Sequence, residues 1–90
     1  MFKVKTEVCG NVDFGQNPNK PPYGVKVITL KSQSLDDLKA KVKEWQYEND
    51  IGGGNWMLPP LYKDDQIVGY MSYNCRIWAD TSFSKEVVFN

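Results

Sequence analysis

The feature that most constrains this fold is one amphipathic segment in the middle of the chain, SLDDLKAKVKEWQYEND, residues 34–50. Its apolar side chains recur every three or four residues, which places them on one stripe of a helix. They are Leu35, Leu38, Val42 and Trp45. Ser34 is a suitable N-cap, and the aspartates that follow match the positive end of the helix dipole. We therefore predict one helix over residues 35–49, which needs a second element to cover its stripe.

Strand-like segments flank this helix on both sides. FKVKTEV, residues 2–8, alternates apolar and polar side chains, and GVKVITLK, residues 24–31, is rich in β-branched residues. After the helix, short apolar segments alternate with turn-forming Asp and Asn, at 61–63, 67–73 and 76–80, and residues 82–89 are expected to add a last edge strand. The order β-β-α-β-β(-β) predicts an α+β fold, a small antiparallel sheet of about four to five strands with the helix packed on one face.

The glycine-rich stretch DIGGGNWMLPP, residues 50–60, directly follows the predicted helix. Glycine is the usual residue in the left-handed position that ends a helix, and we assign that position to Gly52, with Ile51 folding back on the apolar stripe. Trp56 is then expected to anchor one end of the core. A phosphate-binding loop would instead follow a strand, precede a helix and carry a GK[ST] sequence, so this stretch does not fit one.

The residue types exclude most catalytic and metal chemistry. Histidine is absent, which removes the commonest general base and most zinc sites. Cys9 and Cys75 form no CxxC motif and are expected to be free thiols, although Cys75 falls in a predicted turn where a thiol can be exposed. The pairs Asp36–Asp37 and Asp64–Asp65 fit a helix start and a turn. We expect no catalytic residue, no metal and no cofactor, and hence no enzyme.

The charges balance, because Lys and Arg number 11 and Asp and Glu also number 11. Nucleic-acid binders usually carry a basic excess, so such a partner is less expected here. The N-terminal MFKVKTEVCG lacks the apolar run of a signal peptide, and no stretch approaches the ~20 apolar residues of a membrane span. A chain of 90 residues is expected to form a single domain, 1–90, located in the cytoplasm without a membrane partner.

Aromatic residues concentrate in the C-terminal strands. If Ile67, Met71 and Ile77 point toward the helix, then alternation places Tyr70, Arg76 and Trp78 on the open face of the sheet. Tyr, Trp and Arg are the residue types enriched at interface hot spots. The predicted partner-binding residues are Tyr70, Arg76, Trp78, Tyr62 and Trp56. The alternative is that Tyr70 and Trp78 are core residues or simply a cross-strand pair.

The stretch NDIGGGNW after the helix, followed by VGYMSYNCRIW, resembles a group of small uncharacterised phage and prophage proteins. In that group the helix ends in a GGGNW-type stretch, and a later hairpin is similar to YNGRVW. The matching positions are 52–56 and 73–78, within a resemblance that spans roughly residues 34–79. Cys75 departs from the pattern, which has Gly there, and this puts the type of turn in doubt. The resemblance implies a mobile-element origin and no particular activity.

These observations favour a small protein-binding module, a phage accessory protein that acts by occupying its target, with a host-defence inhibitor as one form. A self-associating structural protein, such as a homodimer, is an alternative, because a small sheet has free edges. The other alternative is a single-stranded nucleic-acid binder that stacks bases on the open face and contacts phosphates with lysines of the first two strands. Those lysines are Lys3, Lys5, Lys26 and Lys31.

Overall fold

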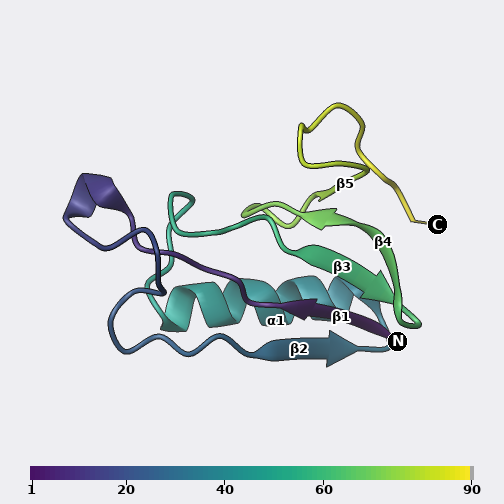
Figure 1. Ribbon diagram of the computed structural model, residues 1–90. Helices are drawn as coiled ribbons and strands as arrows, with labels where there is room; N and C mark the ends of the chain where they lie inside the picture. The colour runs from purple at the N-terminus through teal and green to yellow at the C-terminus, as the bar shows by residue number, and fades with distance from the viewer. Residues whose placement is uncertain (90) are drawn as a thin grey trace.

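The computed structural model describes residues 1–89, and it has one helix and a five-stranded antiparallel sheet in the order β2-β1-β3-β4-β5 (Figure 1). The helix is α1 (Leu35–Glu48), and a short 3-10 turn, η1 (Val12–Phe14), lies in the first long loop. The strands are β1 (Phe2–Lys5), β2 (Thr29–Ser32), β3 (Pro60–Lys63), β4 (Gln66–Met71) and β5 (Ile77–Trp78). The predicted α+β architecture is confirmed. No helix within residues 1–89 is long and apolar enough to cross a membrane.

Helix α1 packs on one face of the sheet and lies behind β1 and β2 in Figure 1. Its predicted stripe is buried, since Leu38, Val42 and Trp45 belong to the core and Leu35 packs against it. The strands contribute inward-facing side chains to the same core, namely Val4, Leu61, Met71 and Ile77. Alternation along the strands therefore leaves the opposite face of the sheet without a covering layer.

The first two strands are shorter than expected because Thr6 interrupts their ladder. Its backbone N–H still donates to the Ile28 carbonyl at 2.8 Å, but its side-chain hydroxyl replaces the backbone carbonyl as acceptor for the Ile28 N–H, also at 2.8 Å. The Glu7 N–H then donates to the Lys5 carbonyl at the end of β1, at 2.8 Å, rather than to β2. Regular pairing thus begins at Thr29 rather than at residue 24.

Helix α1 ends at Glu48, four residues before the first glycine of the glycine-rich stretch, Gly52. Asp50, not Gly52, adopts the left-handed conformation, with φ 55°. The N–H of Asp50 donates to the Tyr47 carbonyl at 3.3 Å, and the N–H of Ile51 donates to the Gln46 carbonyl at 2.9 Å. This is the Schellman pattern, in which the residue after the left-handed position packs on the helix. Ile51 is buried, as predicted, but the assignment of Gly52 was wrong.

A β-bulge in the β3–β4 hairpin overturns one assignment of a side chain to a face. Leu61 pairs with Gly69, but the next residue, Tyr62, pairs with Ile67, so β4 carries one extra residue there. The extra residue, Val68, packs against the core, and Ile67 turns to the open face, where its side chain is 52% exposed. Ile67 therefore does not point to the helix, while Met71 and Ile77 do.

The two turns between the C-terminal strands differ in type. Asp64 and Asp65 both have positive φ, 50° and 68°, which is the two-residue type I′ hairpin turn expected at this pair. In the β4–β5 turn, the Cys75 N–H donates to the Ser72 carbonyl at 2.8 Å and Cys75 has φ 64°. This is a type I turn followed by a left-handed residue, so Cys75 occupies a position that suits glycine. Cys75 is also buried rather than exposed.

Residues 82–89 supply a single bridge instead of the expected edge strand. The Ala79 N–H donates to the Lys85 carbonyl and the Val87 N–H donates to the Ile77 carbonyl, both at 2.8 Å, around the bridge between Trp78 and Glu86. The preceding residues form a loop, which limits the length available for pairing. This segment still covers the outer edge of β5 and sends Val87 against the core.

We expect Asp50→Gly to raise the free energy of unfolding by about 0.5–1 kcal/mol, because glycine adopts a left-handed backbone without steric cost. Gly52→Ala is the matched substitution, because the sequence predicted that Gly52 holds the left-handed position at the end of the helix. It should change stability by less than about 0.5 kcal/mol, because an added Cβ would meet only Asn55 Oδ1, at 3.6 Å. Urea unfolding measures both. A larger loss for Gly52→Ala than for Asp50→Ala would contradict the assignment of the helix end.

Candidate functional site

The open face of the sheet carries four of the five predicted partner-binding residues. Two rows of side chains that run across the strands form this face. Strand register places Pro60, Tyr70 and Trp78 side by side in the first row. It places Lys3 opposite Tyr62 in the second row. Tyr62, Tyr70 and Trp78 are all half-buried, and Arg76 is exposed beside them. The cross-strand pair of Tyr70 and Trp78, considered from sequence as an alternative to binding, is present, and it lies on this uncovered face.

Trp78 is the most constrained residue of this face. Its indole N–H donates to the Ser72 hydroxyl at 3.1 Å, and its ring meets the Phe83 ring edge-on, with centroids 5.3 Å apart. The Arg76 guanidinium lies 6.0 Å from the indole centroid and also pairs with Glu86 at 3.5 Å. Aromatic and cation–π contacts of this kind fix ring orientations before any partner arrives.

Tyr62 and Ile67 form the second row with Lys3. The Lys3 ammonium lies 5.6 Å from the Tyr62 ring centroid and 2.7 Å from an Asp65 carboxylate oxygen. The hydrogen bond to Asp65 and its negative charge raise the pKa of Lys3, and the hydrogen bond from Lys3 and its positive charge lower the pKa of Asp65. This exposed pair neutralises the basic charge next to Tyr62, so the aromatic part of the face is close to neutral.

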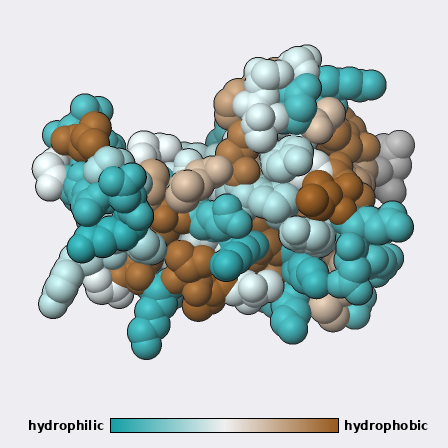
Figure 2. Space-filling model, viewed as in Figure 1, coloured by the Kyte–Doolittle hydropathy of each residue, from teal (hydrophilic) through white to brown (hydrophobic). Residues whose placement is uncertain are grey.

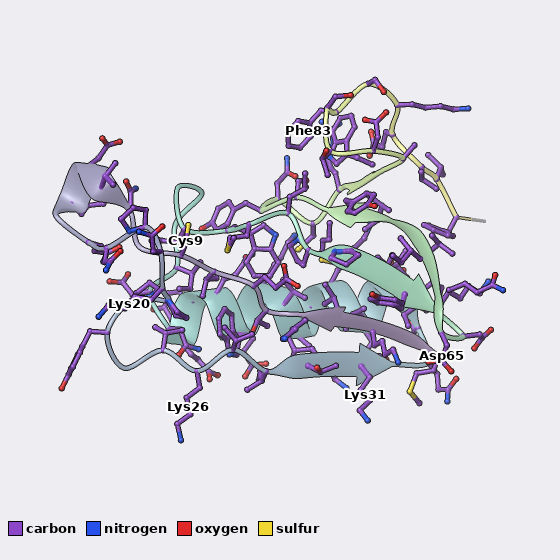
Figure 3. The ribbon with its side chains drawn as sticks, in the orientation of Figure 1. Cys9, Lys20, Lys26, Lys31, Asp65 and Phe83 are labelled. Carbon is purple, nitrogen blue, oxygen red and sulfur yellow. The ribbon has the colours of Figure 1, made fainter. Side chains whose placement is uncertain are left out.

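Figure 2 has the view of Figure 1, and it shows hydrophobic patches separated by hydrophilic side chains rather than one continuous apolar surface. The lysines of the second strand lie apart from the aromatic rows. Figure 3 shows Lys26 and Lys31 pointing outward from the β2 side of the sheet, away from β4 and β5. The open face thus has an aromatic half over β3, β4 and β5 and a basic edge along β2.

Trp56, the fifth predicted residue, is a core residue, which agrees with the expectation that it anchors one end of the core. Its indole N–H donates to the Met71 carbonyl at 2.8 Å, its backbone bridges Val8, and its ring lies 6.4 Å from the Trp45 ring. Only 9% of its surface is exposed. The structure therefore separates it from Tyr70 and Trp78, although its edge borders a pocket next to them.

That pocket has a volume of about 300 Å³. Three segments far apart in the sequence form it: the loop after the helix, the β4–β5 turn and the C-terminal loop. Its lining residues are Gly53, Trp56, Leu58, Ser72, Tyr73, Asn74 and Phe83. This pocket could not be predicted from the sequence, because no motif or spacing connects these loops before the chain folds.

The GGGNW stretch is a structural joint, and Asn55 is its centre. The Asn55 side chain accepts the Gly52 N–H at 3.0 Å and donates to the Cys9 carbonyl at 2.9 Å and to Gln16 Oε1 at 3.1 Å. Gly54 lets the Asn11 side chain lie close to this stretch, since an added Cβ would lie 2.3 Å from Asn11 Nδ2 and would displace that side chain. The stretch therefore ties the end of the helix to the first long loop.

Few groups here could support catalysis or bind a metal. Within residues 1–89, no group of three or more His, Cys, Asp or Glu side chains is placed to hold a metal ion. Both cysteines are free, and burial raises the pKa of Cys75, which keeps its thiol protonated at neutral pH. Another hollow, of about 750 Å³, lies at the C-terminal end of α1 beside Tyr73 and Asn74.

The loop that presents Phe83 is held by one carboxylate. Asp80 accepts hydrogen bonds from the hydroxyls of Ser82 and Ser84, both at 2.7 Å, and from their backbone N–H groups at 3.0 and 3.5 Å. These bonds lower the pKa of Asp80 from 3.8 to about 2. The loop therefore places the Phe83 ring against Trp78 through local hydrogen bonds rather than burial.

No protein-family model matches the chain, and neither a curated protein nor a solved structure matches it.

We expect Asn55→Ala to lower the free energy of unfolding by about 2–3 kcal/mol, because it leaves the half-buried Gly52 N–H and Cys9 carbonyl without their side-chain partner and also removes the bond to exposed Gln16. Chemical denaturation measures the loss. Asn11→Ala is the control, because the Asn11 side chain accepts only one exposed local bond, from the Asp13 N–H at 3.0 Å. Equal effects of the two substitutions would show that Asn55 is not the central contact of this joint.

The Asp80 loop should persist to strongly acid pH. Because the pKa of Asp80 in the folded protein lies below 3.8, its contribution to stability is complete above about pH 4 and is lost as pH falls through about 2. Carboxyl carbon chemical shifts of Asp80 and the ring signals of Phe83 should change together in that window. In Asp80→Asn the Phe83 signals should not show this transition. A midpoint near 3.8 would contradict the hydrogen-bonded loop.

Proposed function

We propose that this protein is a small non-enzymatic binding module whose protein partner docks on the aromatic half of the open sheet face. The observation that supports this most directly is the grouping of Tyr62, Tyr70 and Trp78, all half-buried, on the face that α1 leaves uncovered. A single helix cannot cover both faces of a five-stranded sheet, so these rings remain available to another molecule.

The chemistry of the face suits a protein partner. Tyr, Trp and Arg supply large contact areas with few rotatable bonds and are the residues most often found at hot spots. Here the ring of Trp78 is already fixed by Ser72 and Phe83, so less conformational entropy would be lost on binding. Exposed Ile67 adds an apolar contact next to Tyr62.

The resemblance to small phage and prophage proteins supports a more specific form of this proposal. In it the protein is a phage accessory factor in the cytoplasm of the host, and its partner is a component of host defence that it inhibits by occupancy.

Two alternatives use the same sheet. A single strand of nucleic acid could stack on Tyr70 and Trp78, but Lys3 is neutralised by Asp65 and Arg76 by Glu86, so few phosphate contacts remain beside the rings. A homodimer would pair the β2 edge of two copies, although the Lys41 ammonium already occupies the Lys31 carbonyl there, at 3.0 Å. The neutralised Lys3 and Arg76 count against nucleic acid, and the occupied Lys31 carbonyl counts against pairing of two β2 edges. Both observations favour the protein partner.

The test is affinity capture from a host-cell lysate after nuclease treatment and high-salt washing, compared between variants. Tyr70→Ala and Trp78→Ala should each reduce the captured partner roughly tenfold or more, as hot-spot truncations do. Ile67→Lys tests the same face at an exposed position where the fold should tolerate the change. Tyr47→Ala is the matched control, because Tyr47 is 89% exposed on α1, away from this face.

Circular dichroism must show that each variant is folded before its capture is compared. Equal recovery of the partner by wild type, Ile67→Lys and Tyr70→Ala would refute the proposed face. A parallel capture without nuclease treatment tests the stacking alternative. Nucleic acid recovered there, and lost when nuclease is added, would support that alternative. A dimer that Thr29→Pro dissociates would support pairing of the β2 edges.

A further inference from the structure

The pocket beside the open face contains backbone strain that the fold does not need for its core. Leu58 and Phe83 both line it, and both have left-handed backbones, with φ 57° and 59°. Bulky residues rarely adopt this conformation, and Leu58 also precedes Pro59, which restricts its backbone further. Such strained conformations are energetically costly and are concentrated at binding and active sites.

Neither residue is held in this conformation by burial in the core. Leu58 is half-buried and Phe83 is 49% exposed, so neither belongs to the buried cluster beneath the sheet. Phe83 is placed instead by the exposed Asp80 loop, which turns its ring toward Trp78. In Figure 3 Phe83 lies in the C-terminal loop, at the end of the sheet opposite Asp65. The strained conformations therefore shape the pocket rather than the core.

The size and lining of the pocket define what it can hold. Among the described residues, those that line it carry no charge, and three of them are aromatic: Trp56, Tyr73 and Phe83. An engineered apolar cavity of about 150 Å³ holds benzene, so a hollow of about 300 Å³ has room for one or two fused rings. Aromatic walls favour edge-to-face contact with another ring. The uncharged, aromatic lining therefore suits a neutral aromatic ring better than a phosphate or another ion.

The pocket is continuous with the proposed interface. Phe83 lines the pocket and its ring also packs on Trp78, and Ser72 lines the pocket while accepting the Trp78 indole N–H. A molecule docked over Tyr70 and Trp78 would thus reach the pocket directly. Hot spots lie in pockets of this kind, surrounded by contacts that exclude water.

We propose that this pocket, between Leu58 and Phe83, receives a neutral aromatic side chain of the protein partner as its anchor. The proposal rests on the proposed protein-binding function, and it adds the chemical identity of the group that the partner inserts. Trp56, fixed by its bond to the Met71 carbonyl, forms the rigid floor. Leu58 and Phe83 form walls held open by their left-handed backbones.

The probe is indole, titrated into the full-length protein and followed by the three tryptophan indole N–H signals in a proton–nitrogen correlation spectrum. Signals of Trp56 and Trp78 should shift together, with half-saturation at roughly 1–10 mM, as expected for a ligand this small. Trp78 lies outside the lining but contacts the lining residues Ser72 and Phe83, whereas Trp45 is buried on α1 behind Trp56, so the Trp45 signal should stay nearly unchanged. Equal shifts of all three signals, or none, would overturn the pocket assignment.

Two substitutions separate a binding role from a structural one. Leu58→Gly and Phe83→Asn each remove a wall but keep a residue that tolerates a left-handed backbone. Each should weaken indole binding roughly threefold to tenfold while the melting temperature stays the same or rises, because strain is relieved. Unchanged indole binding in both variants would overturn the role of these residues. Tyr47→Ala should bind indole as the wild type does.

The two proposals fail in different ways. If Tyr70→Ala abolishes capture of the partner but wild type does not bind indole, the anchor pocket is wrong and the interface stands. If indole binds as described but Tyr70→Ala and Ile67→Lys capture the partner normally, the interface is wrong. Loss of capture in Leu58→Gly, with wild-type thermal stability, supports both.

Discussion

The structure depends on the buried indole of Trp56. Its N–H bonds to the Met71 carbonyl, its ring lies against Trp45 of α1, and its backbone bridges Val8. This one residue therefore joins the loop after the helix, the end of β4, the helix and the continuation of β1. A buried Trp that satisfies its N–H combines large apolar area with a directional bond, so it fixes both position and orientation. Asn55, its neighbour, fixes the same loop to the first long loop.

This joint also determines where the candidate site forms. Because Trp56 holds the loop against the end of β4, Gly53 and Leu58 face the β4–β5 turn across a short distance and create the pocket. The Asp80 loop supplies the third wall from the C-terminal end of the chain. The core side of the loop is thus rigid and its outer side is strained and open, an arrangement that suits a preformed binding pocket on a small scaffold.

Local patterns predicted much of the fold. The helix, its Ser34 cap, the turn at Asp64–Asp65 and the single covering layer all follow from periodicity, capping and turn chemistry over a few residues. The placement of Tyr70 and Trp78 on the open face, with Arg76 beside them, also followed, because alternation holds in β4 after the bulge and in β5. The errors came where a long-range contact intervenes. Ile67 changed face because pairing with β3 requires a bulge.

By itself the sequence determined the elements, the buried stripe of the helix and the kinds of side chain on the open sheet face, because each depends on neighbours within a turn or a strand. Only the tertiary structure decided that Asp50 ends the helix, that Thr6 interrupts the first ladder and that three distant loops form one pocket. The reason is that these features depend on which backbone groups remain free after the strands pair and the core closes. The spacing of neighbouring residues in the sequence does not predict that outcome.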